Sequence, residues 1–346
     1  MKAMLLFRIG DLLTNPKPLT LADVPDPEPN IKELLLNVSV CGVCHTELDE
    51  IEGRTLPPSL PIILGHQVVG RVIKTGKGAE VFKVGDRVGV GWIFSSCGTC
   101  VFCTSGRENL CEKFRATGRD AHGGYAQLMT VQQDFAYPIP SAFSDAEAAP
   151  LLCAGAIGYR SLRLCRVEDG HHLGLTGFGA SAHLMIQLVK KKYPSVTIYV
   201  FARNEQERHF AKELGAAWTG DITDPSPVKL DGIIDTTPAW RPVLEALKNL
   251  KRGGRLVINA IRKEEADKTH LLDIRYPEHL WLEKEIKSVA NVTRNDIKEF
   301  LESASQIPIR PKVQEFPLEA ANEALLELKK MQIHGAKVLR VGPDSL

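Results

Sequence analysis

The chain has 346 residues, of which 43 are basic and 42 acidic, leaving a formal net charge of +1. This length exceeds what one ordinary core needs and suits two domains. The balanced charge argues against a nucleic-acid-binding protein, which usually carries a basic excess. No apolar run reaches the roughly 20 residues that span a bilayer. The start, MKAMLLFRIGDLL, lacks a small-residue cleavage site, so we expect a cytoplasmic protein without a membrane segment.

The first 150 residues read as a β-rich region. Short apolar runs alternate with Gly and Pro, which predicts strands over 33–40, 67–76 and 86–93. The Pro-rich stretch 15–30 is expected to be an extended surface loop.

After about residue 150 the pattern changes to strands that alternate with helices. The expected strands are 171–177, 196–202, 231–237 and 253–261, and the expected helices are 180–193, 205–216 and 242–250. This alternation is typical of a parallel sheet covered by helices. Near the end, 321–331 is expected to be an amphipathic helix and 336–341 a strand.

Four of the eight cysteines form one cluster with the spacing C-x2-C-x2-C-x7-C: Cys97, Cys100, Cys103 and Cys111. Closely spaced thiolates on tight turns can reach one tetrahedral ion, and four sulfurs leave no open position, so we expect a structural zinc. An iron–sulfur cluster uses the same ligands and remains an alternative. The segment around the cluster has little apolar content, so the metal should hold it together.

Three further segments carry a family resemblance: CGVCHTELDEIEG, PIILGHQVVG and APLLCAGAIGY. In order and spacing they resemble the medium-chain, zinc-containing alcohol dehydrogenase family. The resemblance implies that Cys44, His66 and Cys153 bind a catalytic zinc whose fourth position stays open. It also implies that the Thr46 hydroxyl accepts the proton of the alcohol.

The sequence departs from the family pattern at two positions. Gln67 follows the zinc histidine, where the family has glutamate, and Asp49 stands where the family has a relay histidine. Trp92 matches a position that lines the substrate pocket, whereas no second aromatic residue lies near Thr55. The resemblance therefore implies a pocket wider than one built for ethanol.

A second motif lies between the strand at 171–177 and the helix at 180–193. The string G-F-G-A-S-A places Gly177 at a tight turn, Gly179 where a pyrophosphate approaches, and Ala182 where helix and strand pack closely. The next strand ends at Ala202, without the acidic residue that binds the ribose of NAD, and Arg203 follows. A guanidinium can clamp a 2′-phosphate, so the sequence favours NADP over NAD.

The predicted fold is α/β, with a GroES-like, β-rich catalytic domain interrupted by a Rossmann domain. The catalytic domain takes 1–151 and 288–346, with the zinc lobe at 95–113, and the Rossmann domain takes 152–287. The predicted protein holds two zinc ions per chain and moves hydride reversibly between NADP or NAD and a small alcohol or aldehyde. The family resemblance implies a homodimer or homotetramer.

Two other functions fit part of the sequence. A zinc-free quinone or enone reductase of the same superfamily would lack the zinc ligands. A zinc-ribbon module that binds nucleic acid could share the four-cysteine lobe, but it does not fit the near-zero net charge or the alternating second half.

Overall fold

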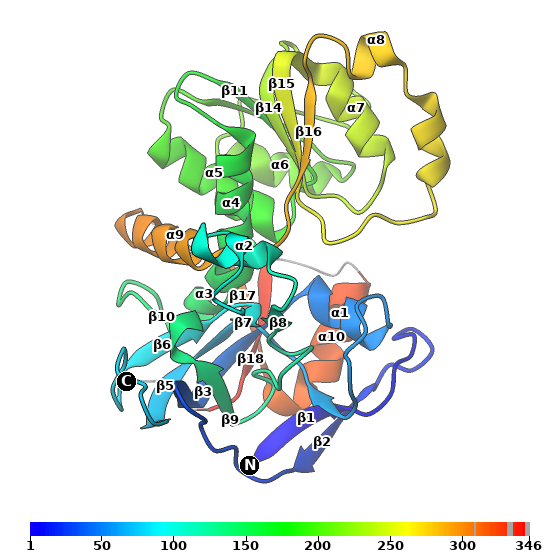
Figure 1. The fold of residues 1–346 in the computed structure, drawn as a ribbon. Coiled ribbons are helices and arrows are strands. Elements are labelled where there is room, and N and C mark those ends of the chain that lie inside the picture. Colours follow the sequence, from blue (N-terminus) through cyan, green and yellow to red (C-terminus); the bar gives the residue numbers. More distant parts are fainter. Residues whose placement is uncertain (308, 331–334, 343–346) are drawn as a thin grey trace. The chain divides into compact units, whose positions relative to one another are not determined.

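The computed structural model describes residues 1–307, 309–330 and 335–342, which divide into two compact units (Figure 1). Unit 1 comprises Met1–Cys153, Thr293–Gln306 and Arg310–Leu346, and unit 2 comprises Ala154–Val292 and Ile307–Ile309. The expected boundaries, at 151 and 288, lie slightly earlier in the chain than those of the structure.

The main sheet of unit 1 has seven strands in the order β10-β6-β5-β3-β18-β17, with β9 also paired to β3. The strands are β3 (Glu33–Val43), β5 (Val68–Thr75), β6 (Arg87–Val90), β9 (Leu128–Gln132), β10 (Ala136–Pro138), β17 (Val313–Pro317) and β18 (Ala336–Arg340). All but one residue of β3 are buried, because β5, β9 and β18 pair with it. This long central strand ends one residue before Cys44.

A smaller sheet of unit 1 corrects one prediction. Within 15–30, which was expected to be a loop, β2 (Leu19–Asp23) pairs antiparallel with β1 (Lys2–Leu6), which also pairs with β4 (Ile62–Ile63). Pro18 and Pro25 flank a segment that is itself free of proline, so β2 keeps every N–H that its ladder needs. The flanking prolines concealed this strand.

Short helices and a small hairpin complete unit 1. The helices are α1 (His45–Ile51), α2 (Val101–Thr104), α3 (Asp145–Pro150), α9 (Arg294–Gln306) and α10 (Ala321–Lys329). β7 (Ile93–Ser95) pairs with β8 (Arg115–Ala116) at the base of the four-cysteine lobe. A continuous apolar core joins both sheets to α1 and α10, with Leu36, Ile51 and Leu325 fully buried within it.

Unit 2 is built on a six-stranded sheet in the order β13-β12-β11-β14-β15-β16, in which every pairing is parallel. The strands are β11 (His172–Thr176), β12 (Thr197–Phe201), β13 (Trp218–Gly220), β14 (Leu230–Asp235), β15 (Leu250–Ile258) and β16 (Glu285–Ser288). The helices are α4 (Ala156–Cys165), α5 (Ala180–Lys192), α6 (Glu205–Glu213), α7 (Arg241–Asn249) and α8 (Tyr276–His279). The predicted α/β fold with a Rossmann-type parallel sheet is confirmed.

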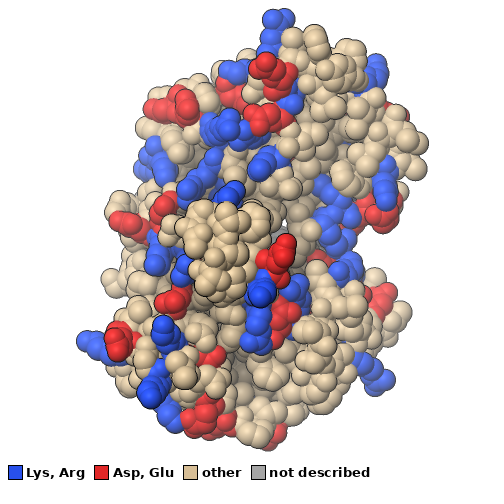
Figure 2. Space-filling model, viewed as in Figure 1, with Lys and Arg blue, Asp and Glu red and all other residues tan. Residues whose placement is uncertain are grey.

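The surface agrees with the near-neutral composition. On the face drawn in Figure 2, basic and acidic side chains are interspersed, and neither sign forms a continuous field. Among the helices of the described residues, none has both the length and the apolarity to cross a membrane.

Gly118, in the loop before β9, should tolerate substitution poorly. Its φ is +83°, and an added Cβ would lie 2.9 Å from the backbone nitrogen of Gly65, the residue before His66. Gly85 has a similar φ of +96° but open space around it. Gly85→Ala should cost about 1–2 kcal/mol of folding free energy for the left-handed backbone alone.

Gly118→Ala should therefore lower the thermal unfolding midpoint further than Gly85→Ala, and it should weaken zinc retention because the His66 loop must shift. Equal shifts in the two variants would contradict this steric account.

Candidate active site

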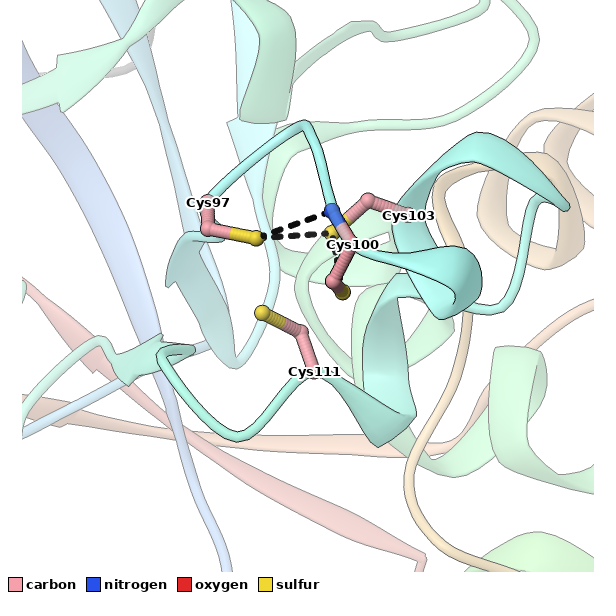
Figure 3. Close-up of side chains that lie close together, drawn as sticks. All are labelled: Cys97, Cys100, Cys103 and Cys111. Carbon is pink, nitrogen blue, oxygen red and sulfur yellow. Dashed lines mark hydrogen bonds between the residues drawn. The ribbon is translucent and has the colours of Figure 1, made fainter.

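The four cysteine side chains of the lobe converge on one point (Figure 3). Their sulfur atoms all lie within 4.8 Å of one another. The Cys97 and Cys103 sulfurs are 3.8 Å apart, and those of Cys100 and Cys103 are 3.6 Å apart. Zinc–sulfur bonds of about 2.3 Å in a tetrahedron require sulfur–sulfur distances of about 3.8 Å. The residues therefore fit a closed zinc site.

The surroundings of Cys97 stabilise its thiolate form. Backbone N–H groups of Thr99 and Cys100 and the Thr99 hydroxyl lower its pKa to about 5. The Cys100 N–H donates to Cys97 Sγ at 3.4 Å. Since the thiolate is the form that binds zinc, the loop favours the metal-binding form of Cys97 even without a metal.

A buried carboxylate anchors the lobe to α9. Glu108 is 2% exposed and accepts hydrogen bonds from the Arg294 backbone N–H at 2.7 Å and from Arg294 Nε at 3.2 Å. The lobe thus has a polar anchor as well as the cysteine cluster, which the sequence alone did not reveal.

The second cluster unites residues from three distant segments of unit 1. Cys44 precedes α1, His66 lies between β4 and β5, and Cys153 lies in a π-helical turn after α3. One ligand atom from each lies within 4.8 Å of the other two, and His66 Nε2 is 3.3 Å from Cys153 Sγ. Two thiols and one imidazole make three protein ligands, the number that a catalytic zinc uses.

Glu47 is a residue of this site that the sequence analysis missed. Its Oε1 lies 2.5 Å from His66 Nδ1, and its Oε2 accepts from the Cys44 N–H at 2.8 Å. Burial opposes a charge on His66, but Glu47 and Cys44 outweigh it and raise the pKa of His66 well above its usual value. The available signal was a glutamate three residues after a helix N-cap, the capping-box spacing.

The hydroxyl assigned to proton transfer lies beside the cluster. Thr46 Oγ1 is 3.8 Å from Cys44 Sγ, and Thr46 is half-buried. The carboxylate of Asp49, which stands at the position of the family's relay histidine, is buried and accepts a hydrogen bond from Arg54 Nε at 2.5 Å.

The position after the zinc histidine is tightly enclosed. Gln67 is 4% exposed, and its carbonyl accepts from the Gly42 N–H at 2.9 Å. A Cβ at Gly42 would meet Gln67 Oε1 at 2.5 Å, so the glycine makes room for this side chain. The remaining two cysteines, Cys41 and Cys165, are buried thiols of the core.

In unit 2 the glycine motif forms the turn between β11 and α5. Gly177 has a φ of +79°, and its N–H donates to the Phe201 carbonyl at 2.8 Å. Gly179 is the N-cap of α5 and has nothing within 4 Å of where a Cβ would be, while Ala182 is fully buried. An open glycine before a helix N-terminus suits a pyrophosphate, whose charge the helix N–H groups favour.

Strand β12 ends at Phe201, one residue earlier than expected, and Ala202 and Arg203 follow it directly. Ala202 is buried, and its carbonyl accepts from Arg208 Nη1 at 2.7 Å. Arg203 is exposed and forms no ion pair with any described acidic residue. Its positive charge partly offsets the rise that burial causes in the pKa of Glu207. Asn204 is the N-cap of α6 and accepts from the Gln206 N–H.

Together, a β-rich unit with both a four-cysteine and a Cys–His–Cys site and a second unit with a nucleotide-type glycine turn define a zinc-binding dehydrogenase. Residues 30–141 match the alcohol dehydrogenase GroES-like domain. The chain is 42% identical to the probable alcohol dehydrogenase AdhA of Mycobacterium tuberculosis (strain CDC 1551 / Oshkosh), covering 99% of this chain and 97% of that protein.

An alcohol dehydrogenase of Geobacillus stearothermophilus is 32% identical, covering 94% of this chain and 97% of that one. Among solved structures, a cinnamyl alcohol dehydrogenase of Sorghum bicolor has a TM-score of 0.83 at 26% identity, covering 98% and 97% of the two chains. The chain therefore belongs to the medium-chain, zinc-containing alcohol dehydrogenase family.

The two ligand sets lead to a prediction of metal content. Metal analysis of the protein should find about two zinc ions per chain, as two complete sites imply. Cys100→Ser and Cys44→Ser should each retain about one. Cys100→Ser should also lower the unfolding midpoint, whereas Cys44→Ser should remain folded without activity. Cys165→Ala, a buried cysteine outside both sets, is the control and should keep both ions. An active enzyme with no more than one metal per chain would refute the two-site account.

The Cys97 environment leads to a prediction of pH dependence. In the metal-free protein, alkylation of Cys97 by iodoacetamide should slow as the pH falls through about 5, because its thiolate is lost there. Thr99→Val removes one stabilising hydroxyl and should move the midpoint upward. Peptide mapping of the alkylated protein measures both. A midpoint near the ordinary value of about 8.5 would show that the loop does not stabilise the thiolate.

Proposed function

We propose that the protein is a zinc-dependent alcohol dehydrogenase that moves hydride reversibly between NADP(H) and an alcohol or aldehyde. The observation that carries this proposal is the convergence of Cys44, His66 and Cys153 with the Thr46 hydroxyl beside them. A zinc ion held by the three ligands would polarise the substrate oxygen and favour its loss of a proton.

Residues of α1 would transfer the proton and orient the metal-binding histidine. The Thr46 hydroxyl accepts the proton of the alcohol and, being half-buried, passes it on to solvent. Asp49 faces Arg54 instead, so the proton path does not depend on it. Glu47 fixes the His66 ring by binding Nδ1, which leaves Nε2 as the metal-binding atom.

The cofactor proposal rests on unit 2. Gly177, Gly179 and Ala182 shape the turn for the pyrophosphate, and Arg203 binds the 2′-phosphate of NADP. The absence of a carboxylate at Ala202 removes the group that would repel this phosphate. NAD is the alternative cofactor, and it would bind without the contribution of Arg203.

The assembly and compartment follow from the family and the thiols. We propose a homodimer or homotetramer, on the family resemblance. All eight cysteines are free in the structure, and six of them lie in the two clusters that could hold a metal ion; thiolate sites of this kind need reducing conditions, which favours the cytoplasm.

The cofactor preference can be measured as kcat/KM for NADP and for NAD with one alcohol. The unmodified enzyme should favour NADP. Ala202→Asp should move the ratio toward NAD by repelling the phosphate, and Arg203→Ala should reduce it by removing the clamp. Arg252→Ala, which removes an exposed arginine elsewhere in unit 2, is the matched control and should leave the ratio unchanged.

A tenfold preference of the unmodified enzyme for NAD, about 1.4 kcal/mol, would contradict the role given to Ala202 and Arg203. Failure to reduce either cofactor with any primary or secondary alcohol would contradict the proposed activity itself.

A further inference from the structure

A buried carboxylate near the Cys–His–Cys cluster has no part in the function described so far. Glu50 is 1% exposed, and neither of its carboxylate oxygens has a hydrogen-bond partner among the described residues. Burying a carboxylate without donors is costly, so such groups persist where they serve a ligand or a reaction.

Glu50 lies on the side of α1 that carries Thr46. The two residues are four apart in one helix, which places them on the same face, one turn from each other. Its neighbours by electrostatic interaction are Glu47, His66, Arg119 and Cys44. Glu50 therefore interacts with two residues of the Cys–His–Cys cluster, Cys44 and His66, and lies one helical turn from the hydroxyl proposed to accept the substrate proton.

Arg119 reaches the same region from the loop between β8 and β9. Its neighbour Gly118 packs against Gly65, the residue before His66. The Arg119 guanidinium donates to Asp120 through Nε at 3.1 Å and Nη2 at 2.7 Å, and it stacks 5.5 Å from the Trp92 ring centroid. Because Asp120 takes these donors, the positive charge of Arg119 is compensated and Glu50 receives no hydrogen bond from it.

Two other polar atoms of these segments are buried and unpartnered among the described residues: Trp92 Nε1, on the residue that stacks with Arg119, and Thr55 Oγ1, just beyond α1. Trp92 Nε1 can only donate a hydrogen bond, whereas a carboxylate accepts. A hydroxyl group does both. An aliphatic chain would satisfy none of these atoms.

We propose that Glu50 is a specificity-determining residue that binds a second hydroxyl of the substrate, so that the enzyme prefers diols or longer polyols to simple alkyl alcohols. Burial, with Glu47 adding to it, raises the pKa of Glu50 well above its usual value. A hydroxyl suits either form, since it donates to a carboxylate and accepts from a carboxylic acid. This inference rests on the proposed alcohol dehydrogenase activity.

The test compares kcat/KM for 1-butanol with that for 1,2-, 1,3- and 1,4-butanediol, which share its chain length. At least one diol should exceed 1-butanol about tenfold in the unmodified enzyme. Glu50→Leu should lower that diol-to-butanol ratio about tenfold, a change of about 1.4 kcal/mol. Glu50→Gln keeps the shape and a weaker, uncharged hydrogen bond, so it should lower the ratio by less.

Glu52→Gln is the matched control, because the Glu52 carboxylate lies two residues further along but binds Lys329 and Arg54. It should leave the diol-to-butanol ratio unchanged. If Glu50→Leu does not fold, a threefold or larger fall of the ratio in Glu50→Gln supports the proposal, and an unchanged ratio overturns it.

The outcomes separate this inference from the proposed function. Oxidation of 1-butanol without preference for any diol overturns the role of Glu50 alone. So does an equal loss with all four alcohols in Glu50→Leu, which would place Glu50 in support of the metal site. No cofactor reduction with any of the four alcohols overturns both proposals.

Discussion

One carboxylate holds two of the three ligands of the Cys–His–Cys site in place. Glu47, which is fully buried, accepts a hydrogen bond from the N–H of Cys44 with one oxygen and binds Nδ1 of His66 with the other. A buried charge of this kind is stable only when its partners are fixed, so the carboxylate, the helix start and the imidazole constrain one another. The ring orientation that a metal requires thus follows from the way α1 begins.

The rigidity of the surrounding sheet extends this constraint. Cys44 directly follows β3, which pairs with three other strands of the main sheet, and β5 begins just after His66. Cys153 lies in a helical turn and not next to a strand of the sheet. Its position therefore depends least on strand pairing. Sites built from side chains on such paired elements hold their geometry better than sites on free loops.

Sequence reasoning captured what depends on local pattern. The spacing of four cysteines, the order of three motifs and the strand–helix alternation are all properties of neighbouring residues, and the structure brings the corresponding groups together. β16 was not predicted, because its sequence EIKS is polar and exposed and lacks a buried-strand pattern. β2 was missed because prolines dominate its surroundings.

The acidic residues of α1 could not be interpreted from sequence for a different reason. In the run Glu47, Asp49 and Glu50, every carboxylate resembles an exposed helical residue, yet all three are buried. Each has a different environment: Glu47 binds a histidine, Asp49 binds an arginine, and Glu50 has no hydrogen-bond donor among the residues that the structure describes. These environments come from segments that fold against α1 from elsewhere in the chain, so only tertiary structure distinguishes them.

The place of β18 in the main sheet bears on how the protein is made. β18 lies between β3 and β17, so the strand that leads into Cys44 lacks one neighbour until residues 336–340 have left the ribosome. By then the whole of unit 2 has been synthesised, and its own parallel sheet needs no strand from unit 1. Because domains tend to fold as units during synthesis, unit 2 can be complete while the main sheet of unit 1 still lacks its last strand. Nascent chains stalled before residue 336 would then leave one edge of β3 open to wrong partners, and the sheet that positions Cys44 is completed only late in synthesis.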